Sequence, residues 1–214
     1  SNSEVKMTTK LAGPKTRFLP FNRGDDGAAG NPLNPHGSAS SYFWEEILQR
    51  DTWLQLLGSF VHLQVETEID PDTGRKTKPQ KVLFPRYHQW RAVTRLVDAA
   101  RGEGPGKRYL VQHSAGSGKS NSITWLAYQL VEQYDTTGTA NLFDSVVVVT
   151  DRRVLDTQLK DNIKLFSETK NIVAHCESAQ ELKYNLELGK KIIITTVQKF
   201  PFIVDGIGQL SDRK

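Results

Sequence analysis

The sequence contains a single cysteine and no hydrophobic run long enough to cross a membrane. Cys176 alone cannot form a disulfide within the chain, which excludes the small secreted proteins built on disulfides and favours a reducing, cytoplasmic location. Every apolar stretch is shorter than the ~18 residues that a transmembrane helix needs, so we expect no membrane partner. Net charge is also small, at +4 over 214 residues. Such a mild excess permits a nucleic-acid partner without requiring one.

The first 40 residues have the composition of a linker or an arm. Glycine, asparagine and proline concentrate between Gly24 and Pro35, which disfavours helices and central strands. From residue 41 the apolar spacing predicts a helical segment capped by Ser41, and Asp51 can cap a second helical segment before Gly58. Alternation of apolar and polar residues then predicts a β-hairpin with strands over 61–69 and 76–84. The side chains expected to face inward from the helical segment are Trp44, Ile47, Leu48, Leu54 and Leu57.

From residue 85 onward the pattern predicts helices that alternate with strands. The strands are apolar with little polar alternation, which indicates a parallel sheet with helices on both faces. The fold class expected is therefore α/β. The expected helices cover 87–100, 119–134, 155–166 and 179–188, and the expected strands cover 108–112, 146–150, a short stretch near 172 and 191–195.

A glycine-rich loop separates the predicted strand over 108–112 from the helix that begins at Lys119. Gly116 and Gly118 let backbone N–H groups turn inward around phosphate oxygens, and the helix start adds partial positive charge. In such a loop the lysine reaches the β- and γ-phosphates and the following hydroxyl coordinates Mg²⁺. The predicted nucleotide site is Ser114, Ala115, Gly116, Ser117, Gly118, Lys119 and Ser120, with Lys119 catalytic and Ser120 the magnesium ligand; His113 stands where this motif has its first glycine.

Arg86 and Gln89, which precede the loop in the sequence, are candidates for base recognition. The carboxamide of Gln89 pairs a donor with an acceptor, which matches the Hoogsteen edge of adenine. Arg86 has a planar guanidinium that can stack on the base. Since an isolated glutamine is usually a surface residue, the prediction depends on the phosphate loop that follows.

Polar residues follow two of the predicted strands. Asp151, after the strand over 146–150, can be read as the magnesium-holding acid of a Walker B motif. The alternative is that Thr150, Arg152 and Arg153 contact a nucleic-acid backbone, and the two arginines directly after Asp151 favour it. The carboxyl ends of parallel strands form the edge where open α/β sheets bind ligands. The residues expected to contact nucleic acid there are Thr150, Arg152, Arg153, Thr196 and Gln198.

The chain also lacks any aspartate followed directly by a glutamate. An ATP-hydrolysing motor uses a second acidic motif of this kind to hold magnesium and to position water. We therefore expect the chain by itself to bind nucleotide weakly and to lack turnover.

These motifs resemble those of a known family. Leu110–Leu130, Phe143–Leu159 and Gly189–Pro201 together resemble the motor region of the type I restriction endonuclease R subunit, a superfamily 2 helicase-like translocase of double-stranded DNA. Phe18–Pro32 and Trp44–Phe60 resemble the segment that joins the nuclease domain to the motor in that family.

The resemblance implies a RecA-like sheet and an ATP-dependent motor that uses Mg²⁺. Its partners would be double-stranded DNA and the methyltransferase and specificity subunits, and translocation would lead to cleavage by a separate nuclease domain. Because a strand with Asp-Glu-Ala-His follows this region in the family, we expect the chain to be a piece of a longer protein. The expected domains are an arm over 1–40, a helical segment with a hairpin over 41–84, and an incomplete first motor domain over 85–214.

The resemblance also assigns roles to the predicted site residues. Arg86 and Gln89 would recognise adenine, and the loop would be motif I. Thr150, Arg152 and Arg153 would belong to motif Ia, and Thr195, Thr196 and Gln198 to a later DNA-backbone motif. Three alternatives remain: another superfamily 2 helicase or translocase, a phosphotransferase or GTPase that uses Asp151, and an assembly platform without enzymatic activity.

Overall fold

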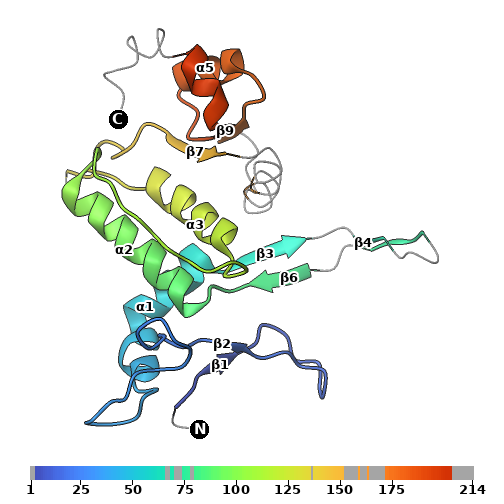
Figure 1. The fold of residues 1–214 in the computed structure, drawn as a ribbon, viewed down its shortest axis with the longest axis vertical. Helices are drawn as coiled ribbons and strands as arrows, with labels where there is room; N and C mark the ends of the chain where they lie inside the picture. The colour runs from blue at the N-terminus through green and yellow to red at the C-terminus, as the bar shows by residue number, and fades with distance from the viewer. Residues whose placement is uncertain are drawn as a thin grey trace. The chain divides into compact units, whose positions relative to one another are not determined.

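The computed structural model describes residues 3–65, 68–69, 74–77, 80–135, 137–151, 159, 163 and 172–203 (Figure 1). The chain divides into two compact units, residues 1–92 and 93–214. Among the described residues, no helix combines the length and the apolar character that a membrane crossing requires.

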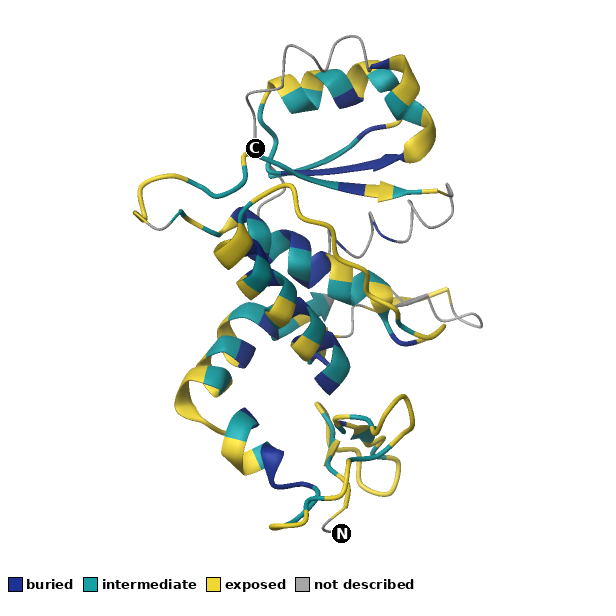
Figure 2. Ribbon diagram, turned by 60° about the vertical axis from the view of Figure 1, so that its left-hand side comes forward, coloured by how far each residue is buried: buried dark blue, intermediate teal, exposed yellow. Residues whose placement is uncertain are grey.

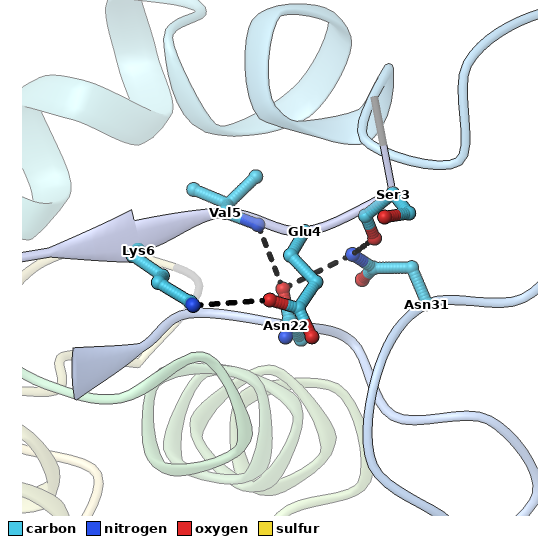
Figure 3. Close-up of polar contacts among 6 residues, drawn as sticks. All are labelled: Ser3, Glu4, Val5, Lys6, Asn22 and Asn31. Carbon is cyan, nitrogen blue, oxygen red and sulfur yellow. Dashed lines mark hydrogen bonds and ion pairs between the residues drawn. The ribbon is translucent and has the colours of Figure 1, made fainter. Parts of the chain in front are cut away.

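The arm at the start of the first unit has more structure than its composition predicts. Two short strands, β1 (Lys6–Met7) and β2 (Leu19–Pro20), pair antiparallel. Asparagine side chains tie the following loop to them: Asn22 Oδ1 accepts from Val5 N–H at 2.9 Å, and Asn31 Nδ2 donates to Asn22 Oδ1 at 3.1 Å (Figure 3). Side-chain amides thus replace the backbone ladder that a glycine-rich segment cannot supply.

The helical segment consists of three short pieces instead of a regular amphipathic helix. They are η1 (Phe43–Ile47), α1 (Arg50–Gln55) and η2 (Leu56–Phe60), and both η pieces have π-helical hydrogen bonding. Ser41 does not cap the segment, because Tyr42 is the N-cap residue of η1 and the Ser41 hydroxyl donates to Glu45 Oε2 at 3.0 Å.

The prediction of which side chains of this segment face the interior is mostly wrong. Ile47, Leu56 and Phe60 are fully buried. A break between η1 and α1 and the wider π turns shift the phase of the chain, so a 3.6-residue period does not carry across the segment. The predicted inward residues that prove to be 46–56% exposed are Trp44, Leu48, Leu54 and Leu57.

The hairpin is confirmed. Strand β3 (His62–Val65) pairs antiparallel with β6 (Gln80–Leu83), and β4 (Glu68–Ile69) pairs with β5 (Lys76–Thr77). The predicted turn over 70–74 lies outside the described residues, except for Gly74, whose φ is +65°.

Helix α2 (Tyr87–Glu103) follows the hairpin and begins within an aromatic cluster. Its first residue, Tyr87, and Trp90 one turn later are 4% and 3% exposed, and their rings lie 5.5 Å apart. Trp90 Nε1 also donates to Gln55 Oε1 of α1 at 3.3 Å. Phe21 of the arm and Tyr42, the N-cap residue of η1, complete the cluster and are 2% and 3% exposed.

The second unit contains the predicted parallel sheet. Its strands are β7 (Val146–Thr150), β8 (Val173–His175) and β9 (Ile192–Thr196), in the order β7-β9-β8 and all parallel. Every residue of the central strand β9 is buried, as its dark blue colour in Figure 2 shows. A mixed α/β fold with a small parallel sheet is thereby confirmed.

Helices cover both faces of this sheet (Figure 1). Ile192 and Ile194 of β9 pack in one cluster with Ala127 and Val131 of α3 (Lys119–Val131). Ile193 points to the opposite face, as strand geometry requires. There it packs with Leu182 of α5 (Ala179–Glu187), together with Ile203 and the 3₁₀ helix η3 (Val197–Phe202).

One predicted helix and one predicted strand differ from the structure or lie outside it. The helix over 155–166 lies outside the described residues apart from Leu159 and Ile163, which are buried in the α3 cluster. The strand over 108–112 does not form, and Leu110 within it is 93% exposed. A strand needs a hydrogen-bonded neighbour, and none of the strands in the described part of the chain pairs with this segment.

Replacing Leu182 should destabilise the second unit. Leu182→Ala removes a fully buried side chain between α5 and β9, so we expect the free energy of unfolding to fall by about 2–5 kcal/mol in urea titrations. Leu188→Ala, at a residue that is 57% exposed, is the matched control and should change it by at most about 0.5 kcal/mol. Equal effects of the two substitutions would contradict this packing.

Tyr42 should make the stability of the chain depend on alkaline pH. Burial, followed by the nearby Tyr87, raises the pKa of Tyr42 from 10.0 to about 12. The folded state therefore holds this proton more tightly, and its contribution is complete below pH 10 and is lost as pH rises toward 12. Unfolding midpoints measured across this range should decline less in Tyr42→Phe than in the parent chain, whereas Tyr184→Phe, at a residue that is 62% exposed, should follow the parent.

Candidate nucleotide-binding loop and sheet edge

The glycine loop has the backbone conformation that a phosphate-binding loop requires. Gly116 and Gly118 have φ angles of +73° and +82°, and Gly118 is the left-handed N-cap residue of α3. A Cβ at Gly116 would meet nothing within 4 Å, so the backbone angle and not crowding selects glycine there. Any other residue in this conformation costs roughly 1–2 kcal/mol.

The start of α3 keeps its positive character. No side chain caps it, and its first turn contains no acidic residue. Asn121 N–H and Ser122 N–H both donate to Gly118 O, at 3.1 and 3.3 Å. A helix start that no acidic side chain offsets favours a bound anion.

Lys119 lies over the loop. Its Nζ donates to Ser114 O at 2.9 Å and to His113 O at 3.3 Å, and the residue is exposed. The ammonium group is therefore held on the same loop whose backbone the glycines shape. Two left-handed glycines, an uncapped helix start and a lysine fit a polyphosphate group.

The other predicted loop residues differ in accessibility. Ser114, Ala115 and Gly116 are exposed, whereas Ser117 is 8% exposed and its N–H donates to Ser114 O at 3.3 Å. Ser120 is half-buried in the first turn of α3, and its carbonyl accepts from the Thr124 hydroxyl at 2.9 Å.

Within the described residues, no group of three or more His, Cys, Asp or Glu side chains is placed to hold a metal ion. A magnesium ion bound through Ser120 would share its shell with phosphate oxygens and water, as is usual for this ion.

The adenine-recognition candidates lie in the first unit, at the start of α2. Gln89 is only 3% exposed, and its Oε1 accepts from Arg86 N–H at 2.8 Å. Arg86 O in turn accepts from the N–H groups of Gln89 and Trp90, both at 3.0 Å. Gln89 thus fixes the first turn of α2 and holds the backbone of Arg86, whose side chain is half-buried.

The sheet brings together three of the five residues predicted to contact nucleic acid. Thr150 and Thr196 are register partners on β7 and β9, at the carboxyl edge. Gln198 Nε2 donates to Asp151 O at 3.0 Å, which places the start of η3 against the end of β7. Gln198 is exposed and Thr150 half-buried, whereas Thr196 is 5% exposed. Arg152 and Arg153 lie outside the described residues.

A contact between Lys199 and the backbone of Cys176 was not predicted from the sequence. Lys199 Nζ donates to Cys176 O at 2.6 Å and so ties η3 to the residue that follows β8. The partners are 23 residues apart, and the acceptor is a backbone carbonyl, which leaves no trace in side-chain composition.

Known proteins resemble this chain in two ways. A family model for the SWI2/SNF2 ATPase matches residues 88–214. A Methanocaldococcus jannaschii protein with the provisional name type I restriction enzyme MjaVIIIP endonuclease subunit is 30% identical over 148 residues, which is 66% of this chain and 13% of that protein. The type I restriction enzyme HindI endonuclease subunit of Haemophilus influenzae is 32% identical over 122 residues, 53% of this chain and 11% of that protein.

The chain thus spans about one eighth of the length of these curated relatives. Their names confirm the resemblance to type I restriction endonuclease subunits that the motifs predict. The family model covers more than half of the chain and includes the glycine loop, α3 and the whole parallel sheet. On this match, the chain belongs to the SWI2/SNF2 ATPase family.

Proposed function

We propose that this chain supplies the ATP-binding part of a motor that moves along double-stranded DNA within a type I restriction enzyme. The loop from Ser114 to Ser120 supports the proposal, because two glycines with positive φ, the start of α3 and Lys119 occur together in it. Bound ATP with Mg²⁺ would supply the phosphoryl group whose transfer drives movement.

The residues of the chain would have separate tasks in this motor. Lys119 would neutralise the β- and γ-phosphates, and Ser120 would contribute one oxygen to Mg²⁺. Arg86 would stack on the adenine, with Gln89 holding the turn from which it projects. Because the chain contains no Asp-Glu pair, we propose that it binds ATP without appreciable turnover by itself.

DNA would be bound at the carboxyl edge of the sheet. The contacts between β7, β9 and η3 support this proposal, since they gather Thr150, Thr196 and Gln198 at one edge. Arg152 and Arg153 follow β7 directly in the sequence and would add the positive charge that a phosphate backbone requires. DNA cleavage and assembly with methyltransferase and specificity subunits would belong to the complete enzyme.

The family match disfavours the phosphotransferase alternative. In that alternative Asp151 holds magnesium in a phosphotransferase, whereas the chain matches an ATPase family. An assembly platform without nucleotide binding does not account for the conformation of the loop.

Lys119→Ala should weaken ATP binding. The ammonium makes charge-assisted hydrogen bonds to phosphate, so its loss should lower affinity for a fluorescent ATP analogue by about tenfold or more. Lys107→Ala, which removes the same charge from an exposed position in the second unit, is the matched control. Equal affinity in the two variants would contradict the proposed nucleotide site, and an ATPase activity that Lys119→Ala abolishes would contradict the expected lack of turnover.

Replacing both arginines after Asp151 should reduce the salt dependence of DNA binding. Each phosphate contact contributes about one unit to the slope of log affinity against log salt, so the Arg152→Ala/Arg153→Ala variant should lose about two units. The control is Arg95→Ala/Lys107→Ala, which removes two exposed positive charges elsewhere. If both double variants lose the same slope, then the sheet edge is not the DNA site.

A further inference from the structure

The glycine-rich arm has a buried anchor on the helix that carries the proposed base-recognition residues. Phe21 is 2% exposed although the arm residues around it are mostly exposed. Its ring lies 5.8 Å from the Tyr87 ring in an edge-to-face arrangement and 6.0 Å from the Phe84 ring. Aromatic pairs of this kind stabilise a contact beyond the area that they bury.

Tyr42 contacts both Phe21 and Tyr87. Its ring packs edge-on against Tyr87 at 5.3 Å, and its hydroxyl donates to the carbonyl of Phe21. The guanidinium of Arg23 lies 5.7 Å from the centre of the Tyr42 ring. The Tyr42 hydroxyl is protonated at neutral pH, and burial, which raises its pKa to about 12, keeps it a donor well into the alkaline range.

The contacted residue, Tyr87, is the first residue of α2 and is held from a second side as well. Its hydroxyl donates to Glu46 Oε2 at 3.3 Å, and the other oxygen of Glu46 pairs with Arg91 Nη1 at 3.1 Å. The arm and η1 therefore both brace the first turn of α2. Arg86 and Gln89, linked by the 2.8 Å hydrogen bond, flank Tyr87 in this turn.

We propose that the arm, together with Tyr42 at the start of η1, is a positioning element for base recognition: Phe21 and Tyr42 hold Tyr87, and through it they fix the conformation of the Arg86–Gln89 turn. This inference rests on the proposed nucleotide function. It gives the arm a task that its composition does not indicate, and it makes Phe21 and Tyr42 positioning residues that never touch the ligand.

Hydrogen exchange of the full chain tests the structural half of the proposal without nucleotide. In Phe21→Ala, the Gln89 and Trp90 amides, which donate to Arg86 O, should exchange about tenfold faster because the ring contacts are lost. Tyr42→Phe removes only the hydroxyl and should give about a fivefold increase. Leu33→Ala, at an arm residue that is 94% exposed, is the control, and the amides of α3 should be unchanged in all variants.

Base preference tests the functional half. The ratio of ATP to GTP affinity should fall toward one in Phe21→Ala, while affinity for inorganic triphosphate should stay within about twofold of the parent chain. A parent chain that binds no ATP would overturn the proposed function, and the exchange data would still decide whether the arm holds the turn. Unchanged exchange at 86–90 in both variants, or an unchanged ATP to GTP ratio in a chain that binds ATP, would overturn the positioning role.

Discussion

Strand β9 is the element on which the second unit depends. Its two edges pair with β7 and β8, and its two faces are covered by the α3 and α5 clusters. The register of this strand is strongly specified. A slip of one residue would turn Ile193 toward the face that Ile192 and Ile194 now occupy, and it would turn those two residues toward the opposite face. The same register sets Thr196 beside Thr150. Packing in the interior therefore determines which polar groups meet at the carboxyl edge.

In its described residues, the first unit contains no comparable sheet and is organised by aromatic side chains. Four almost fully buried aromatic residues come from the arm, the start of η1 and α2: Phe21, Tyr42, Tyr87 and Trp90. Rings of this size provide a large buried area from few residues, which suits a segment with little regular secondary structure. Asparagine amides complete the arm by satisfying backbone groups that strands would otherwise pair. The second unit is thus stabilised by a buried parallel sheet, and the first by a cluster of aromatic side chains.

The sequence predicts the second unit better than the first for a physical reason. Val146–Thr150 and Ile192–Thr196 are apolar strands between helices, and local pattern is sufficient to identify them. The segment over 108–112 has the same local pattern, but a strand also needs a neighbour, which local pattern cannot supply. In the first unit, Asp51 indicates that a second helical segment begins, but the buried face of η1, α1 and η2 also follows from π turns that no periodicity reveals. The loop at Gly116–Lys119 was predictable because its chemistry depends on adjacent residues, whereas the contact between Phe21 and Tyr87 joins residues far apart in the sequence.

The two hydrogen bonds that Lys119 donates within its own loop affect how binding energy is counted. An incoming phosphate exchanges these bonds for its own, so the gain is a difference between two sets of interactions and not the sum of new ones. In return, the ammonium is already confined close to the place where an anion would sit, and little side-chain entropy remains to be lost on binding. At the proposed site, Lys119 would therefore lose little side-chain entropy when an anion binds, but it would also gain less than two new hydrogen bonds suggest.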